Sequence, residues 1–309
     1  MTEIIVRDAV PADYEAMAGV YRSCHPALLV SAASIAHAAS TYASDGLTEF
    51  VAELDGVVVG NGSVWPNSWS GQEGAVQMDI SVLPGSRRRG AGSALLAALE
   101  RRYAELGGRV ALGNVEEGDG LAFVGKRGFT TGRVARVSRC VLTRIPAETA
   151  APEGVRVVRL SELDDLRGLY ESDTLAAADI PSDSPIVPYG FEIWKSRLLD
   201  DPRLDHDLSV ASLVGDTVTA MAYLQRVGER VHSSFTGAHP GFRGRGHATL
   251  VKSRALHSAR AAGATEAFTT NDAKNAPMLA VNTSLGYEPF LERTALRREG
   301  AAPGGGVAG

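Results

Sequence analysis

The chain carries the same short motif twice, and this repetition limits its possible folds more than any other feature. The motif reads Arg-x-x-Gly-x-Gly over Arg87–Gly92 and Arg-x-x-Gly-x-Ala over Arg243–Ala248, 156 positions later. Further along, Gly128-Phe129 is matched by Gly286-Tyr287 at an offset of 158. Landmarks at a nearly constant, long offset predict two copies of one domain.

The length of 309 residues suits two domains, because single domains cluster near ~100–150 residues. The offset predicts a first domain over residues 1–145 and a second over 155–299. Residues 146–154 are small and contain proline, so we expect a linker there. Residues 300–309 are rich in glycine and have nothing to bury, so we expect a disordered tail.

Both copies show the same order of expected elements: strand, amphipathic helix, hairpin, strand, Arg/Gly loop and helix. The elements before the loop are expected at 4–7, 11–21, 49–65 and 75–83 in the first copy and at 155–160, 162–170, 209–225 and 231–238 in the second. Gly107 and Gly263 end the helices that follow the loops. The pattern predicts an α/β (α+β) fold whose central sheets are largely antiparallel.

Composition excludes several function classes. A hydrophobic content of 44% with 22% charged residues is typical of a globular chain, and the net charge of −5 disfavours a nucleic-acid binder. Cys24 and Cys140 are too few for a disulfide framework or a four-thiolate metal site, so no metal is expected and a reducing compartment is indicated. No apolar run approaches ~18–20 residues, and the start does not read as a signal peptide. We expect a cytoplasmic protein without membrane contact.

The Arg/Gly loops are suited to a pyrophosphate. Each follows a strand and opens a helix, so free N–H groups and the helix dipole face whatever lies in the loop. Glycines allow close approach to the backbone, and guanidinium groups pair with phosphate oxygens. The candidate cofactor-binding residues are Arg87, Arg88, Arg89, Gly90, Ala91, Gly92 and Ser93 in the first copy and Arg243, Gly244, Arg245, Gly246, His247 and Ala248 in the second.

Three alternative types of phosphate or nucleic-acid site fit these loops less well. A Walker loop needs Gly-Lys-Ser/Thr after the glycines, and a dinucleotide fingerprint needs Gly-x-Gly-x-x-Gly with a later acidic residue. A single-stranded nucleic-acid patch would interleave aromatic residues with wider basic charge. A plain turn with solvated arginines stays open, although two copies in matching contexts disfavour it.

The loops and their flanks resemble the acetyl-CoA signature of the GNAT superfamily of N-acetyltransferases. The resemblance rests on Val82-Leu83-Pro84 and Ala94-Leu95-Leu96 around the first loop and on Ala238-His239-Pro240 and Leu250 around the second. Asn271, Asn275, Asn282 and Leu285-Gly286-Tyr287 add the family's fifth strand and following helix. As a tandem pair, the resemblance covers nearly the whole chain and is similar in layout to mycothiol synthase and its actinobacterial relatives.

The resemblance implies two GNAT-like domains, each with a splayed sheet open between its fourth and fifth strands and acetyl-CoA in the gap. Backbone groups at Val82 or Ala238 would hold the pantetheine arm. Asn271 and Asn275 would line the cleft of the second copy, although turn formation and helix capping explain them equally well. The fuller signature favours the second copy for bound acetyl-CoA.

The implied reaction is direct transfer of an acetyl group to a small-molecule amine, because neither cysteine has the context of a nucleophile. A protonated amine needs a proton acceptor. Asp79 is our candidate, since alternation along the fourth strand sets it opposite Met78 and Ile80; a solvated strand residue is the alternative. The tyrosine acid found in many family members is replaced by Val124 and Asn282.

Two other functions stay open. A non-catalytic acyl-CoA-binding protein would explain the missing tyrosines and the presence of Phe235 where the first copy has Asp79. Acetylation of protein N-termini or lysines is the other. The sequence does not identify the acceptor or the catalytic copy, and it fits a monomer or a homodimer.

Overall fold

The chain folds into two compact units. The structure, a computed structural model, describes residues 3–116, 118–178, 180–181 and 186–300. Unit 1 comprises Met1–Val134 and Arg293–Gly309, and unit 2 comprises Ala135–Glu292. Apart from Gly300, the expected tail lies outside the described residues.

The units divide the chain at other residues than the expected boundaries of 145 and 155, because the repeats exchange their last strands. Strand β6 (Thr130–Val141), at the end of the first repeat, pairs antiparallel with β11 of unit 2 from Ala135 onward. Strand β12 (Glu288–Glu299), at the end of the second repeat, pairs antiparallel with β5 of unit 1 from Arg293 onward. Each unit therefore completes its sheet with a strand that belongs to the other repeat in sequence.

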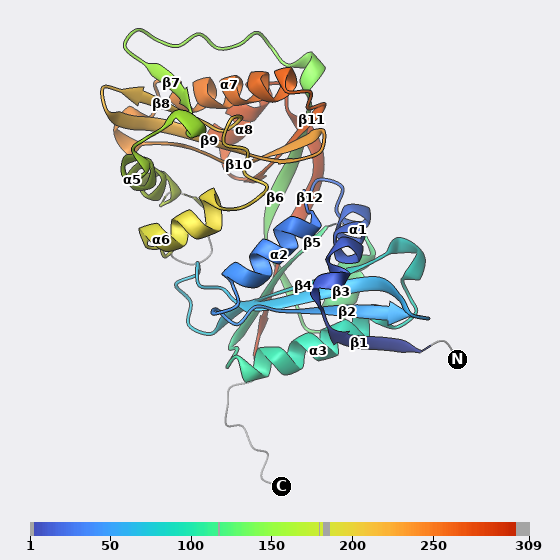
Figure 1. Ribbon diagram of the computed structural model, residues 1–309. Coiled ribbons are helices and arrows are strands. Elements are labelled where there is room, and N and C mark those ends of the chain that lie inside the picture. The colour runs from blue at the N-terminus through green and yellow to red at the C-terminus, as the bar shows by residue number, and fades with distance from the viewer. Residues whose placement is uncertain (1–2, 117, 179, 182–185, 301–309) are drawn as a thin grey trace. The chain divides into compact units, whose positions relative to one another are not determined.

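Unit 1 is a sheet in the order β1-β2-β3-β4-β5-β12 with helices on both faces. Helices α1 and α2 lie on one face and α3 on the other (Figure 1). Its elements are β1 (Ile4–Asp8), α1 (Tyr14–Cys24), α2 (Ala32–Thr41), β2 (Thr48–Leu54), β3 (Val57–Pro66), β4 (Ala75–Val82), α3 (Ala91–Glu105), β5 (Val110–Glu116) and α4 (Asp119–Gly125), with short 3₁₀ turns at Pro11–Asp13 and Pro84–Ser86.

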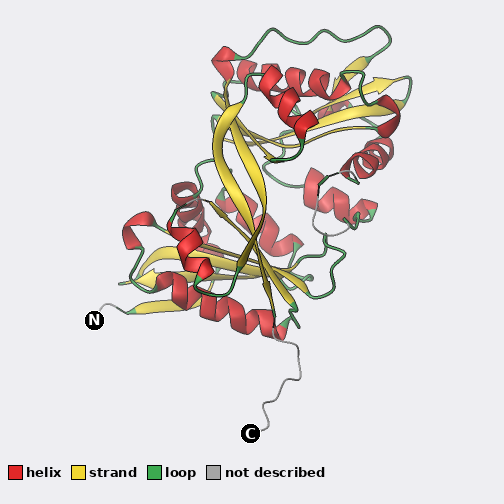
Figure 2. Cartoon of the chain, turned by 180° about the vertical axis from the view of Figure 1, so that it is seen from behind, coloured by secondary structure: helices red, strands yellow, loops and turns green. Residues whose placement is uncertain are grey.

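Unit 2 repeats the arrangement in the order β6-β11-β10-β9-β8-β7. Helices α5 and α7 pack on opposite faces of its sheet (Figures 1 and 2). Its elements are β7 (Arg156–Arg159), α5 (Leu166–Ala177), α6 (Phe191–Trp194), β8 (Val210–Val214), β9 (Thr217–Val227), β10 (Arg230–Ala238), α7 (His247–Ala261), β11 (Glu266–Asp272) and α8 (Ala276–Ser284), with short turns at Leu142–Arg144, Leu160–Glu162, Lys195–Leu199 and Pro240–Phe242.

Local sequence explains where the helices begin and end. Helix α5 starts later than expected because the Asp165 carboxylate accepts the N–H groups of Arg167 and Gly168, which caps the helix there. Helices α3 and α7 end before Gly107 and Gly263, whose φ angles of 66° and 86° suit glycine.

The helices bury their apolar stripes against the sheets. In α3 the buried residues include Leu95, Leu96 and Leu99, and in α7 they include Leu250 and Val251. Burying each leucine contributes roughly 2 kcal/mol.

Both sheets are splayed, as the resemblance implied. β4 and β5 run parallel but pair only from Ala75–Val110 to Gln77–Leu112, after which both strands continue unpaired with each other. β10 and β11 likewise pair only from Arg230–Glu266 to Ser233–Thr269. The pairs β1–β2, β2–β3, β3–β4, β5–β12, β6–β11, β7–β8, β8–β9 and β9–β10 are antiparallel, which confirms the predicted mixed, mostly antiparallel class.

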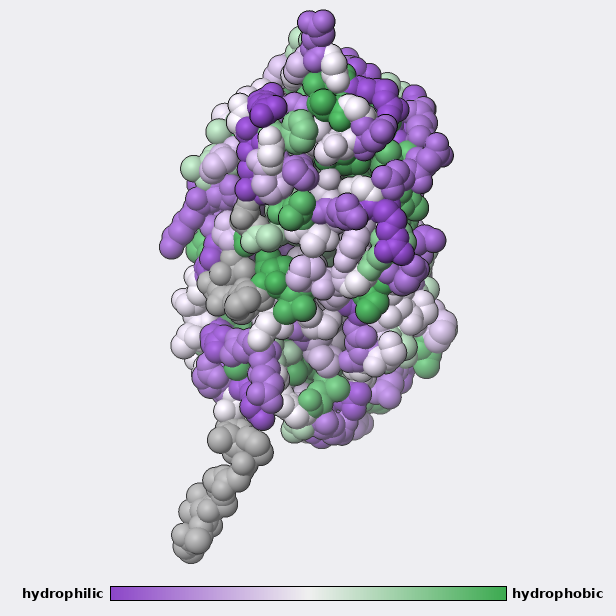
Figure 3. Space-filling view, turned by 90° about the vertical axis from the view of Figure 1, so that its left-hand side faces the viewer, coloured by the Kyte–Doolittle hydropathy of each residue, from purple (hydrophilic) through white to green (hydrophobic). Residues whose placement is uncertain are grey.

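Hydrophobic residues are scattered among hydrophilic ones on the face drawn in Figure 3. Over the described ranges, no helix combines the length and the hydropathy needed to cross a bilayer.

Candidate active site

A cavity of about 650 Å³ opens in unit 1 where β4 and β5 separate. Its walls are the diverging ends of these strands, the Arg/Gly loop and helix α4. The volume is in the range of small-molecule sites in proteins. The first copy therefore has a ready space beside its phosphate-binding signature.

The Arg/Gly loop has the backbone that an anion site needs. Gly90 has φ 100° and is the N-cap of α3, so the first N–H groups of this 15-residue helix face the loop. Arg87, Arg88 and Arg89 are exposed beside it. All of the predicted loop residues except Arg89 line the cavity.

Arg88 adopts a backbone conformation that normally favours glycine. Its φ is 64°, and the equivalent position in the second copy, 156 residues later, is Gly244 with φ 72°. An L-residue in this region costs about 1–2 kcal/mol. The first copy thus keeps an arginine at the mouth of the cavity against a backbone cost that the second copy avoids.

The end of strand β4 presents main-chain groups to the opening. Leu83 N–H donates to Val59 O (2.9 Å), so by antiparallel alternation the N–H groups of Ile80 and Val82 point away from β3 and toward β5. The Val82 carbonyl is engaged, because it accepts from Arg87 Nε (3.2 Å) and Cys24 Sγ (3.3 Å). At Val82 it is therefore the N–H that can hold a pantetheine arm.

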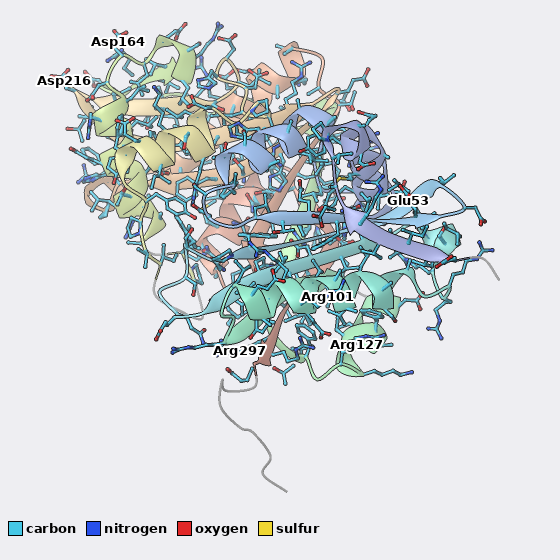
Figure 4. All side chains as sticks on the ribbon, turned by 60° about the horizontal axis from the view of Figure 1, so that its bottom comes forward. Glu53, Arg101, Arg127, Asp164, Asp216 and Arg297 are labelled. Carbon is cyan, nitrogen blue, oxygen red and sulfur yellow. The ribbon has the colours of Figure 1, made fainter. Side chains whose placement is uncertain are left out.

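Arg127, which follows helix α4, brings a positive charge to the cavity that no sequence motif predicted. The Arg127 guanidinium lies 3.6 Å from the centre of the Phe123 ring, and its Nη2 donates to Ser93 Oγ (2.8 Å). Arg127, Phe123 and Ser93 all line the cavity, and Arg127 is labelled in Figure 4. A Cβ at Gly92 would lie 3.4 Å from Phe123, so glycine leaves room here. Only the fold brings Arg127 to the loop, 34 residues after Ser93.

Asp79 does not line this cavity, although its neighbours Met78 and Ile80 do. On β3 its pairing partner is Ser63. Burial raises the pKa of the Asp79 carboxyl, and the charge of Arg293 opposes that shift. Its role as proton acceptor stays a prediction.

Three residues that the sequence did not group together meet at the opening. His25, just after α1, has Nε2 at 2.8 Å from Ser81 Oγ on β4 and Nδ1 at 3.0 Å from Glu116 Oε1 on β5. All three line the cavity. They are 56 and 35 residues apart along the chain, so no local pattern could have grouped them.

In the corresponding region of unit 2, buried polar side chains bond to one another. Lys252 occupies the position equivalent to Leu96 of the cavity wall and is 1% exposed. Its Nζ donates to Asn282 Oδ1 (2.6 Å) and Thr269 Oγ1 (3.2 Å), and Asn282 Nδ2 donates to Asn271 Oδ1 (2.7 Å). This network ties α7, α8 and β11 together.

The remaining predicted residues of the second copy also serve the fold of unit 2. Asn275 caps α8, its Oδ1 accepting from Met278 N–H (3.3 Å). His247, equivalent to Ala91, is 4% exposed, and its Nδ1 lies 2.7 Å from Thr219 Oγ1. Burial, with the charge of Arg245, lowers the pKa of His247.

The second loop otherwise keeps the layout of the first. Ala238 O accepts from Arg243 Nε (3.4 Å), as Val82 O accepts from Arg87. Gly246, with φ 80°, is the N-cap of α7, ahead of Ala248. The second copy thus keeps the Arg/Gly loop, while the buried side chains of Lys252, Asn282 and Asn271 bond to one another.

Comparison with known proteins decides the family. Residues 14–129 match the model of the acetyltransferase (GNAT) family. This part of the chain is similar to GNAT domains. The match confirms the resemblance carried by the Arg/Gly motif, and the matched residues include the cavity wall from Cys24 to Phe129.

Solved structures extend the GNAT likeness over both copies. A tandem GNAT protein from the clavulanic acid biosynthesis pathway has a TM-score of 0.76 at 18% identity, covering 97% of this chain and 100% of its own. A GCN5-related N-acetyltransferase from Sphaerobacter thermophilus has a TM-score of 0.72 at 18% identity, covering 96% and 95%. A putative acetyltransferase from Pyrococcus horikoshii has a TM-score of 0.61 at 14% identity, covering 96% and 90%. These likenesses show the tandem GNAT fold. No curated protein matches the chain.

Proposed function

We propose that the protein is an acetyl-CoA-dependent N-acetyltransferase that acts on a small-molecule amine by direct transfer, with the cofactor held in unit 1. The observation that carries this proposal is the cavity between β4 and β5, which adjoins a left-handed glycine at a helix N-terminus and a row of exposed arginines. The family model supports acetyl transfer as the reaction.

The residues around the cavity fit coenzyme A. The N–H groups at the start of α3 and the guanidinium groups of Arg87, Arg88 and Arg127 would hold the pyrophosphate. The N–H of Val82 would hold the pantetheine arm. Acetyl-CoA would supply an acetyl group activated as a thioester. The N–H of Ile80 would stabilise the oxyanion, an effect of about 3 kcal/mol in comparable sites.

Direct transfer is favoured because the thiol that adjoins the cavity is not activated. Burial raises the pKa of the Cys24 thiol, and its Sγ donates to Val82 O. A thiol in this state is a poor nucleophile. Asp79, with a pKa raised by burial, is the candidate proton acceptor from the sequence, and His25 at the cavity is its rival.

Two measurements test this function. Isothermal calorimetry should detect binding of CoA, and acetyl-CoA mixed with a panel of small amines should release free thiol. Binding without thiol release on any amine would instead indicate a non-catalytic acyl-CoA-binding protein. Absence of both would refute the proposal. Acetylated protein found by mass spectrometry, with no amine turned over, would indicate a protein acetyltransferase.

Replacing Arg88 with glycine should weaken CoA binding without destabilising the fold. The change removes one charge from the anion site, for which we expect a loss of about 1 kcal/mol, or roughly fivefold in Kd. It also removes the strain of an arginine in a left-handed backbone conformation, so the melting temperature should stay equal or rise. Calorimetry and thermal unfolding check the two effects.

The matched control is the reverse exchange, Gly244→Arg, in the second copy. It should destabilise the protein by about 1–2 kcal/mol and leave CoA affinity unchanged. If R88G binds CoA as tightly as the wild-type protein does, Arg88 does not contact the cofactor.

A further inference from the structure

We propose that His25, oriented by Glu116, takes the proton of the acceptor amine through the hydroxyl of Ser81. The inference rests on the proposed function and names the proton path at the same site. In this path Ser81 contacts the substrate, and His25 and Glu116 act through it.

Hydrogen-bond chemistry fixes the direction of the path. A carboxylate accepts but does not donate, so the contact of 3.0 Å to Glu116 Oε1 places the proton of neutral His25 on Nδ1. Nε2 is then an acceptor, and at 2.8 Å it takes the hydrogen bond of the Ser81 hydroxyl. Ser81 is thereby paired with a base that a third group orients, which is the general arrangement for activating a proton donor.

The location of the three residues matches that of the proposed reaction. Ser81 lies on β4 and Glu116 on β5, beyond the last pair of the parallel ladder at Gln77–Leu112, so the His25 side chain spans the opening between the strands. All three residues line the cavity. The two ends of the path differ in exposure, since Ser81 is 4% exposed while the His25 side chain is 25% exposed. A proton that enters at Ser81 can therefore leave to water at His25.

A buried amide lies beside Ser81. Asn61 pairs with Ser81 across the β3–β4 ladder and is 1% exposed, yet neither of its side-chain atoms has a hydrogen bond of good geometry within the described part of the chain. The Tyr21 hydroxyl lies close enough to Asn61 and Ser63 to affect its own pKa.

The charged and titratable groups around His25 are compatible with this role. Glu116 faces it from β5, and Asp79 of β4 lies near enough for the two charges to interact. Tyr21 of α1 has its ring centre 6.4 Å from that of His25. Cys24 remains a thiol, and the nearby Arg87 guanidinium bonds to Val82 O. The imidazole of His25 is thus faced by groups from α1, β4 and β5.

The step balances as follows. The lone pair of the amine nitrogen forms the C–N bond, and its N–H proton passes to Ser81 Oγ while the Ser81 hydroxyl proton passes to His25 Nε2. The C–S bond breaks with its electron pair on sulfur, and the thiolate takes a proton from the imidazolium or from water. No oxidant, reductant or covalent enzyme intermediate is needed.

Three variants separate this path from a purely structural tie. His25→Gln can keep both hydrogen bonds but cannot take a proton, so we expect kcat to fall at least ~100-fold with CoA affinity and melting temperature unchanged. His25→Ala should be equally slow and regain activity when imidazole is added. Ser81→Ala should match H25Q in kcat. Asp79→Asn is the comparison: the path predicts a smaller loss than in H25Q.

A readout that needs no turnover checks the geometry. The chain has seven histidines, and we label them with ¹⁵N. The NMR spectrum should contain the signals of one imidazole that is protonated on Nδ1 and not on Nε2, and these signals should be missing from the spectrum of H25Q. Glu116→Gln should change the shifts of that imidazole. The opposite tautomer would contradict the path.

The outcomes distinguish the path from the function on which it rests. If the wild-type protein neither binds CoA nor turns over any amine, the proposed function is wrong. If the wild-type protein turns over an amine and H25Q keeps more than a fifth of its kcat, the His25 path is wrong. If D79N is inactive while H25Q is active, Asp79 is the base. Acetylated Ser81 in the intact mass spectrum would replace direct transfer with a seryl ester and overturn the path as written.

Discussion

Replacing Gly90 with valine should abolish detectable binding of CoA, whereas the same change at Gly246 should leave it intact. Both glycines are left-handed N-caps of 15-residue helices, with φ of 100° and 80°. A β-branched residue cannot hold this backbone conformation, so the N–H groups at the start of the helix turn away from the bound phosphates. We expect at least ~100-fold loss of affinity in G90V, equal to about 2.7 kcal/mol.

The pair is closely matched, which isolates ligand binding from stability. A Cβ at either glycine meets nothing within 4 Å, so the destabilisation in each variant should come mainly from the strained backbone conformation. The melting temperatures of the two variants should therefore fall by a similar few degrees. Calorimetry with CoA then reports which copy binds. Loss of binding in G246V with retention in G90V would move the cofactor to unit 2, as the fuller signature of the second copy suggested.

The stability of unit 2 should increase with pH from about 7 to about 9 because of one lysine. Lys252 is fully buried and bonded to the neutral side chains of Asn282 and Thr269, and burial lowers its pKa from 10.5 to about 7. Between these values the unfolded chain binds the proton and the folded unit does not, so the free energy of unfolding rises with pH. From pH 7 to pH 9 we expect a gain of about 2 kcal/mol.

One neighbouring group opposes this effect at the upper end of the window. Burial raises the pKa of the Cys140 thiol to about 11 and that of the Tyr287 phenol further. Above about pH 8 the unfolded chain therefore begins to lose the Cys140 proton while the folded unit keeps it, which offsets a small part of the gain up to pH 9 and a larger part beyond it. Urea unfolding monitored by Trp194, the one tryptophan of unit 2 in the sequence, gives the free energy at each pH.

Lys252→Met is the control for this prediction. The variant loses the bonds to Asn282 and Thr269, so its stability at one pH is not diagnostic. Its slope is diagnostic: the rise between pH 7 and pH 9 should disappear. An equal rise in K252M and in the wild-type protein would assign the effect to other groups.

The fold was predictable from sequence because its signals are local or periodic. The hairpin turn at Asp55-Gly56, for example, takes φ of 52° and 75°, as such a pair predicts. The Arg/Gly loops likewise lie between a strand and a helix in both units. The exchange of β6 and β12 was not predictable, because a strand's own residues specify its exposed and buried faces but not which sheet edge it joins.

The candidate site divides in the same way. The sequence by itself predicted the family, an anion-binding loop and a class of cofactor, since these predictions depend on neighbouring residues whose backbone forms the loop. Only the tertiary structure showed the cavity between β4 and β5 of unit 1. Leu96 and Lys252 occupy equivalent positions in similar helices, but Leu96 lines that cavity, whereas Lys252 is buried within hydrogen-bonding distance of Asn282 and Thr269. His25, Ser81 and Glu116 came together for the same reason: contacts between distant segments form only when the sheet brings them to one opening.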